Sequence, residues 1–325
     1  MQSRHIKPIT IISIIALSAV LLYLFYWLAG VDVITVGQLT RGLSRRFSRV
    51  VAMIIVAITM GITGLVFQTL THNRVLTPSV IGFDSTFILS QTLIVFVFGS
   101  QTILIANAYY NFILSTALMV GTSMLLYGFV LRKGKNNLAL LLLVGMVFRT
   151  LMGSLTSFLN RVIDPEDFLV VTSRTMPSLT NMNTDILWLV ALPVMVITLL
   201  FMIKDLKYFD VMNLGEDQAK SLGIDYLKMM NKSLILISIL ISVSTALVGP
   251  LMFLGLLSVN LAREILKTDY HKPIFFVSSL LGIVFLVLGQ FVLQVFKLNT
   301  SLSVLINLVG GIYMIIILIK GDKKS

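Results

Sequence analysis

The chain has 325 residues, of which 57% are hydrophobic and 12% are charged, and its mean hydropathy is +0.97. A water-soluble domain of this length cannot bury so much apolar surface, so the composition predicts an all-α protein that crosses the membrane many times. In a soluble protein the net charge of +11 would suggest nucleic-acid binding, but here the positive-inside rule explains it better. With no cysteine and three widely separated histidines, the sequence predicts neither a disulfide nor a metal site.

About ten apolar segments approach the ~20 residues that a membrane-spanning helix needs. The first follows Arg4 and Lys7 and is too long for a typical signal peptide, so we interpret it as a retained helix. Two of the segments, Phe83–Phe98 and Leu251–Leu261, are short for a full crossing, and Gly249-Pro250 predicts a turn or a broken helix. The expected spans are Ile9–Leu28, Val50–Leu70, Phe83–Phe98, Phe112–Leu131, Leu138–Leu159, Ile186–Ile203, Leu234–Val248, Leu251–Leu261, Ile274–Phe296 and Leu302–Ile319.

The lysines and arginines predict the orientation of these spans. An even number of spans puts both termini on one side, and that side then holds seventeen of the 25 basic residues, against seven on the other. Both termini and the polar stretch 204–232 are therefore expected in the cytoplasm. We expect one transmembrane domain over residues 1–325, with close helix packing where small residues recur, as at Ala57, Gly61 and Gly64.

The stretch 204–232 is the longest charged segment between apolar runs, and its centre is typical of a short exposed helix. Gly215 and Gly223 predict a turn at each end, and Glu216 and Lys220 form an i,i+4 pair. We expect Ala219 and Leu222 on a second, apolar face. Such a helix suits docking to a soluble partner; the alternative is an ordinary cytoplasmic loop.

Two other features break the expected pattern. Arg149 lies in the middle of a span, where an arginine costs roughly 2.5–3.5 kcal/mol, and no other span offers an obvious acidic partner at matching depth. It either lines a pathway for an anionic solute or is a structural arginine.

The outer loop 41–49 carries four arginines on the side where the positive-inside rule disfavours them. These predict docking of an acidic partner or, alternatively, anchoring to lipid headgroups.

The sequence contains no visible catalytic motif. Gly134-Lys135-Asn136 resembles a phosphate-binding loop only superficially, because the preceding glycine has the wrong spacing and Asn136 replaces the required Ser or Thr. A protein of this kind that moves a solute uphill would need its nucleotide site on another chain.

Four motifs stand in order between about Arg46 and Lys320. They are Arg46-Phe47-Ser48-Arg49, then Gln68–Asn73, then the stretch from Gly215 to Gly223, and last Gly249-Pro250 followed by Phe253, Gly255-Leu256 and Ala262-Arg263. Together they resemble the permease subunits of bacterial ABC importers for iron–siderophores and vitamin B12. The first is similar to that family's Arg-Leu-Pro-Arg and the second to its Gln-Gly-Leu-Thr-Arg-Asn, while the third resembles its coupling segment and is the most specific match.

Three positions depart from the family pattern. Val259-Asn260-Leu261 stands where Pro-His is frequent, Arg74 replaces a proline, and Ser301-Leu302-Ser303 replaces Pro-x-Gly. Together the departures resemble a branch associated with catecholate siderophores, and they favour a ferric catecholate over vitamin B12.

The resemblance implies ten helices, a homo- or heterodimer of permeases, two cytoplasmic ATPases that hold ATP and Mg, and an extracytoplasmic siderophore-binding protein. It implies an importer of the bacterial plasma membrane with no cofactor on this chain. By position, Arg46 and Arg49 would meet the binding protein, and Asn73 would lie near the cytoplasmic gate. The coupling residues would be Leu214, Gly215, Glu216, Ala219, Ser221, Leu222 and Gly223. Arg149 matches no family motif; we assign it to the pathway because ferric catecholates are strongly anionic.

The rival interpretations are a secondary transporter driven by an ion gradient, a membrane enzyme, and a family member that carries heme or vitamin B12. The first needs inverted repeats with ion-binding breaks, and the second needs a nucleophile with its base or a ligand set. The sequence shows neither feature.

Overall fold

The computed structural model describes residues 3–26, 36–133, 138–298 and 300–322. The described part is built from helices and contains no strand, as the composition predicts. The helices are α1 (Ser3–Phe25), α2 (Val36–Leu70), η2 (Pro78–Ile81), α3 (Phe83–Phe98), α4 (Ile103–Ala106), α5 (Ala108–Lys133), α6 (Leu138–Val162), α7 (Pro165–Thr175), α8 (Thr184–Ile186), η3 (Leu187–Ala191), α9 (Leu192–Lys204), α10 (Leu206–Met212), α11 (Glu216–Ser221), α12 (Tyr226–Val248), α13 (Leu254–Leu266), α14 (His271–Val295) and α15 (Leu302–Asp322).

Each of the ten predicted spans overlaps a helix in the described part of the chain, but the span predicted from Leu251 becomes helical only at Leu254, and the one predicted to end at Phe296 ends at Val295. Seven described helices are long and apolar enough to cross a membrane, while α3 and α15 are shorter apolar helices and α13 has 13 residues. The chain is therefore a multi-pass membrane protein, and the number of ten crossings stays a prediction.

One boundary differs substantially from its prediction. We expected a loop at 41–49 and a span from Val50, but α2 is helical from Val36 and has 35 residues. At 1.5 Å per residue it is about 50 Å long, well beyond the ~30 Å apolar core of a bilayer. The arginines in this region do not interrupt the helix because long charged side chains are good helix formers and can reach toward water.

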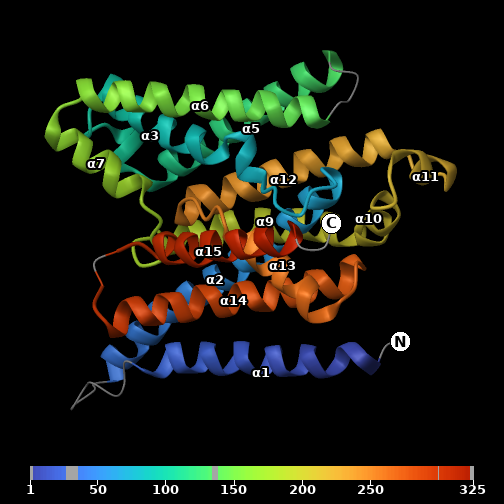
Figure 1. Ribbon diagram of the computed structural model, residues 1–325. Coiled ribbons are helices and arrows are strands. Elements are labelled where there is room, and N and C mark those ends of the chain that lie inside the picture. Colours follow the sequence, from blue (N-terminus) through green and yellow to red (C-terminus); the bar gives the residue numbers. More distant parts are fainter. Residues whose placement is uncertain (1–2, 27–35, 134–137, 299, 323–325) are drawn as a thin grey trace.

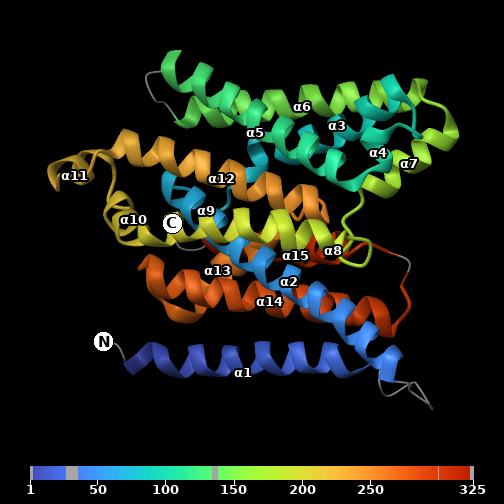
Figure 2. The same ribbon diagram turned by 180° about the vertical axis from the view of Figure 1, so that it is seen from behind.

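The long helices run side by side, and the polar segments collect at the two ends of the bundle (Figure 1). The start of α1, the end of α15 and the short helices α10 and α11 lie at one end. The end of α1, the start of α2, α7, the end of α14 and the start of α15 lie at the other end (Figure 2). This arrangement supports the prediction that both termini share a side with the 204–232 stretch.

Helix α2 is the centre of the bundle and packs against α14, α13, α12 and α9. In the apolar stretch of α2 that is long enough to cross a membrane, 83% of the residues are buried, compared with 11% in that of α6. Small side chains permit the close crossings: Gly282 of α14 lies against Ala57, and a Cβ on Gly255 of α13 would lie 2.5 Å from the carbonyl oxygen of Met60. The predicted role of Ala57, Gly61 and Gly64 in helix packing is confirmed.

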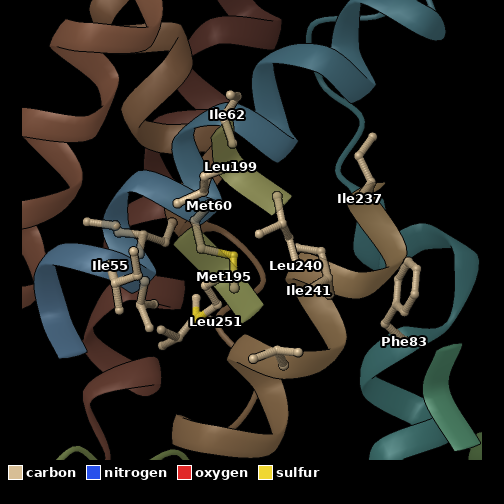
Figure 3. Close-up of a cluster of buried hydrophobic side chains, with 14 of the residues drawn as sticks. Ile55, Met60, Ile62, Phe83, Met195, Leu199, Ile237, Leu240, Ile241 and Leu251 are labelled. Carbon is tan, nitrogen blue, oxygen red and sulfur yellow. The ribbon is translucent and has the colours of Figure 1, made fainter. Parts of the chain in front are cut away.

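The core beside this crossing joins α2, α9 and α12. Figure 3 shows Met60 above Met195 of α9, with Leu240 of α12 beside them and Leu251 below. Leu251 follows the predicted break at Gly249-Pro250, where α12 ends. Gly249 has φ +89°, and a Cβ there would lie 2.6 Å from the Cα of Pro177, so only glycine fits the turn.

Candidate functional site

The short helix α11 has the glycine-bounded form that the sequence predicts. Gly215 precedes it with φ +109°, and Gly223 follows it with φ +82°. The Ile224 N–H donates to the Ala219 carbonyl (3.0 Å) and the Gly223 N–H to the Lys220 carbonyl (2.9 Å), which is a Schellman motif. Since a left-handed residue is needed at each end, the two glycines fix where α11 begins and ends.

The surface of α11 is mainly polar, with two apolar side chains at its ends. Glu216 accepts from Lys220 across one turn at 2.6 Å, and this hydrogen bond raises the pKa of Lys220. Leu214 and Leu222 are 58% and 63% exposed. Ala219 is fully buried against the protein, so the expectation that it shares an exposed apolar face with Leu222 is wrong. Leu222 lies just beyond the last helical residue, where the chain has already turned.

The turn after α2 contains Asn73, the residue expected near the gate. Asn73 is exposed, and its side-chain oxygen accepts from the Val75 N–H at 2.9 Å. The neighbouring Arg74 carbonyl accepts from two buried amides, Gln68 of α2 (3.0 Å) and Asn260 of α13 (2.9 Å). Two of the departures from the family pattern, at positions 74 and 260, therefore meet directly in the fold.

The structure gives Arg149 an acidic neighbour, which the sequence analysis did not find. Gly82, between η2 and α3, packs on the Cα and Cβ of Arg149, so α3 begins beside the middle of α6. Asp84, in the first turn of α3, interacts electrostatically with Arg149. Asp84 is 7% exposed, and its Oδ2 atom has no hydrogen-bond partner among the described residues. The expectation that no span offers an acidic partner is therefore wrong.

Arg46 and Arg49 lie on α2 at the end opposite α11. Arg46 donates to the carbonyl of Tyr23 at 2.6 Å and to Gln294 at 3.4 Å, so it joins α1, α2 and α14. Arg49 donates to the carbonyl of Thr180 at 3.4 Å and is partly exposed. Between them, the exposed Phe47 ring stacks on Trp188 at 6.2 Å. Both arginines are therefore partly exposed and bonded within the bundle, and the bond of Arg49 is the longer one.

A polar cavity of about 350 Å³ opens at the same end as Arg46 and Arg49, and sequence reasoning did not indicate it. Its walls come from α3, α5, α7, the α7–α8 connection and the end of α12, segments separated by more than a hundred residues, so no local pattern could reveal it. Its polar lining residues are Asn111, Ser173, Arg174, Ser178, Asn181 and Asn183.

The predicted site residues thus fall into three groups along the bundle. The coupling residues 214–223 and Asn73 lie toward one end, Arg149 near the middle of α6, and Arg46 and Arg49 toward the other end. Among the described residues there is no cluster of three or more His, Cys, Asp or Glu side chains that could hold a metal ion.

Comparison with known proteins shows the family of the chain. The model of the FecCD transport family matches residues 9–320. The chain belongs to the FecCD transport family. Its members are permease subunits of ABC transporters, which are not enzymes and which work with ATPase and binding-protein partners.

Several FecCD relatives match over most of their length. The petrobactin import system permease protein YclO of Bacillus subtilis (strain 168) is 44% identical over 322 residues, covering 99% of each chain. The petrobactin permease FatC of Bacillus anthracis is 33% identical, covering 85% of this chain and 78% of its own. The ferric enterobactin permease FepG of Escherichia coli (strain K12) is 24% identical, covering 86% and 82%.

A solved structure supports the FecCD fold independently. An inward-facing metal-chelate type ABC transporter superimposes with a TM-score of 0.81 over 97% of this chain and 99% of its own. At 20% identity this likeness shows the fold alone.

Proposed function

We propose that the chain is the membrane permease of an ATP-driven importer for a ferric siderophore of the catecholate type, with petrobactin as the first candidate. The 44% identity to YclO over nearly the whole of both chains carries this proposal. Petrobactin is a catecholate siderophore, and this agrees with the branch that the sequence resembles. Heme and vitamin B12 remain the alternative cargoes within the family.

In this proposal α11 is the coupling helix, which binds an ATPase subunit and transmits its movement to the permease. It presents the exposed Leu214 and Leu222 at its ends and the Glu216–Lys220 pair between them. Apolar anchors with a charged rim suit a cleft on a soluble subunit. ATP and Mg would bind to two such ATPase subunits, and this chain, as a single transmembrane domain of the bacterial plasma membrane, needs no cofactor.

At the opposite end, Arg49 and Arg46 would meet acidic residues of the siderophore-binding protein. Arg49 is the better candidate for direct contact because its hydrogen bond to the Thr180 carbonyl is long, at 3.4 Å, whereas Arg46 makes a bond of 2.6 Å within the bundle. Between the two ends, Arg149 would line the pathway for the anionic cargo, and Asn73 would lie near the cytoplasmic gate.

We infer that the second permease is a different chain. Two distinct Bacillus subtilis proteins carry the description of petrobactin import system permease, and this chain is 44% identical to YclO but 24% identical to YclN. A partner that resembles YclN would give a heterodimer, with the pathway between the two chains.

The proposal is tested by uptake of radioactive ferric petrobactin into proteoliposomes that contain both permeases and the ATPase, with loaded binding protein outside. We expect uptake that requires ATP and is inhibited by vanadate, with ferric enterobactin and heme as competitor cargoes. Uptake driven by an ion gradient without nucleotide would contradict the proposal and favour a secondary transporter. Preferential uptake of heme would retain the importer and change its cargo.

A further inference from the structure

Three side chains from distant parts of the sequence form one chain of hydrogen bonds at the α11 end of the bundle, and only its Asp210 end is partly exposed, at 29%. Asp210 lies on α10, His271 begins α14, and Thr69 lies in the last turn of α2. The Asp210 Oδ1 atom is 2.6 Å from Nδ1 of His271, and Nε2 of the same ring is 2.6 Å from the Thr69 hydroxyl. His271 and Thr69 are 1% and 2% exposed.

Asp210 accepts two hydrogen bonds from one residue. Its Oδ1 atom accepts the backbone N–H of His271 at 2.7 Å as well as bonding to the ring, so the carboxylate faces two groups of the same residue. The Thr69 hydroxyl lies within hydrogen-bond distance of both the Leu65 carbonyl (3.0 Å) and Nε2, and the tautomer of His271 decides whether it donates to Nε2 or accepts from it. Burial raises the pKa of Asp210, but the hydrogen bonds and charge of His271 lower it by more, so the carboxylate form is favoured.

An aspartate, a histidine and a hydroxyl in this order have the atoms of a nucleophilic triad. The hydroxyl is nevertheless inaccessible to a substrate, because Thr69 is 2% exposed and its oxygen is hydrogen-bonded to the Leu65 carbonyl. No substrate reaches it. The chain of bonds is therefore suited to holding elements together rather than to chemistry.

On one side this chain of bonds is continuous with the coupling helix. Asp210 lies five residues before Gly215, and the backbone between them stays bonded: Leu214 N–H donates to Val211 and Gly215 N–H to Met212. The other end of α10 is braced by Asp205, which accepts from Lys232 of α12 at 2.6 Å. A displacement of α11 therefore moves α10 as one piece.

On the other side the chain of bonds reaches the turn that contains Asn73. Thr69 is one residue before the end of α2, and the turn follows at once. The Arg74 carbonyl in this turn is held by the buried amides of Gln68 and Asn260, and the Arg74 side chain meets Asp269 at 2.9 Å, two residues before His271. The end of α2, the turn and the start of α14 are thus joined.

We propose that Asp210, His271 and Thr69 are positioning residues that transmit the displacement of α11 to α2 and to the turn around Asn73. Without these hydrogen bonds, α11 would still dock on the ATPase. Its displacement would then move α10 relative to α2 and α14 and would not be transmitted to them. The proposal rests on the proposed function, since it concerns how ATP hydrolysis on the partner is coupled to transport by this chain.

The test compares two replacements of the same carboxylate in the assembled importer in proteoliposomes. In Asp210→Asn the amide oxygen still accepts from both N–H groups of His271, whereas Asp210→Ala removes the acceptor. We expect Asp210→Ala to lower the siderophore transported per ATP hydrolysed about tenfold, the effect of one charge-assisted hydrogen bond on a conformational equilibrium, while ATPase co-purification is retained. Asp210→Asn should keep most of the wild-type ratio. Glu264→Ala, which removes an exposed carboxylate from α13, is the charge-matched control.

An unchanged transport-to-ATP ratio in Asp210→Ala would overturn the proposal. If that variant does not assemble, Thr69→Val is the second test, because it keeps the shape of the side chain and removes the hydroxyl that bonds to Nε2 and to the Leu65 carbonyl. Uncoupling in Thr69→Val supports the link, and a wild-type ratio refutes it. A wild-type complex without any ATP-dependent uptake would instead contradict the proposed function itself, so the two failures are distinguishable.

Discussion

The strongest prediction about stability concerns the Asp84–Arg149 pair. Replacing Arg149 with leucine removes a cation from the middle of α6 but leaves the Asp84 carboxylate buried, with one oxygen lacking a hydrogen bond within the described structure. Asp84 and Arg149 make no direct ion pair in the described structure, so Arg149→Leu removes a longer-range attraction to a buried carboxylate rather than a contact. We therefore expect a loss of about 1–3 kcal/mol, the cost of leaving a buried polar group less well compensated.

The assay is the midpoint of thermal unfolding of purified protein in detergent, measured for the two single variants and their combination. Arg149→Leu should unfold well below wild type, and Asp84→Asn should recover much of the loss in the double variant, because no buried charge then remains unpaired. Equal midpoints for Arg149→Leu and wild type, or effects that simply add, would refute the pairing. The folded double variant also isolates the pathway role, since it lacks the cation; reduced siderophore uptake would support that role.

Three further predictions concern other parts of the bundle. Gly255→Ala places a methyl group 2.5 Å from the Met60 carbonyl oxygen, and we expect a loss of about 1–3 kcal/mol, measured by thermal unfolding. Gly223→Ala forces a left-handed residue with a side chain at the end of α11 and should weaken ATPase binding by about 1 kcal/mol, measured by titration, with unchanged folding of the bundle. Arg46→Glu with Arg49→Glu should weaken binding-protein docking and its salt dependence, and unchanged affinity at low salt would remove these arginines from the interface.

Local patterns in the sequence are sufficient for the helices and for α11. Apolar runs of membrane length predict the spans because a bilayer requires continuous helical hydrogen bonding. Gly215 and Gly223 predict the ends of α11 because few other residues adopt positive φ. The prediction of a loop at 41–49 is wrong because arginine is a good helix former, and α2 continues through these residues beyond the membrane.

The missed features depend on contacts between distant segments. Asp84 meets Arg149 because the short α3 starts beside the middle of α6, and neither sequence window shows this. His271 and Asp210 are 61 positions apart and look like ordinary polar residues at helix ends. Asn260 departs from the family pattern, and its side-chain amide donates a hydrogen bond to the Arg74 carbonyl, a contact between residues 186 positions apart.

The claim that the partner ATPase acts through α11 has a direct test, because the chain has no native cysteine. The Leu222→Cys variant places one thiol on the exposed end of α11, and Leu169→Cys, with similar exposure on α7 at the opposite end, is its control. In membranes that contain the whole importer, we expect Leu222→Cys to cross-link to the ATPase and Leu169→Cys to react with a membrane-impermeant thiol reagent added outside. Labelling of Leu222→Cys from the outside, with no cross-link to the ATPase, would contradict the account.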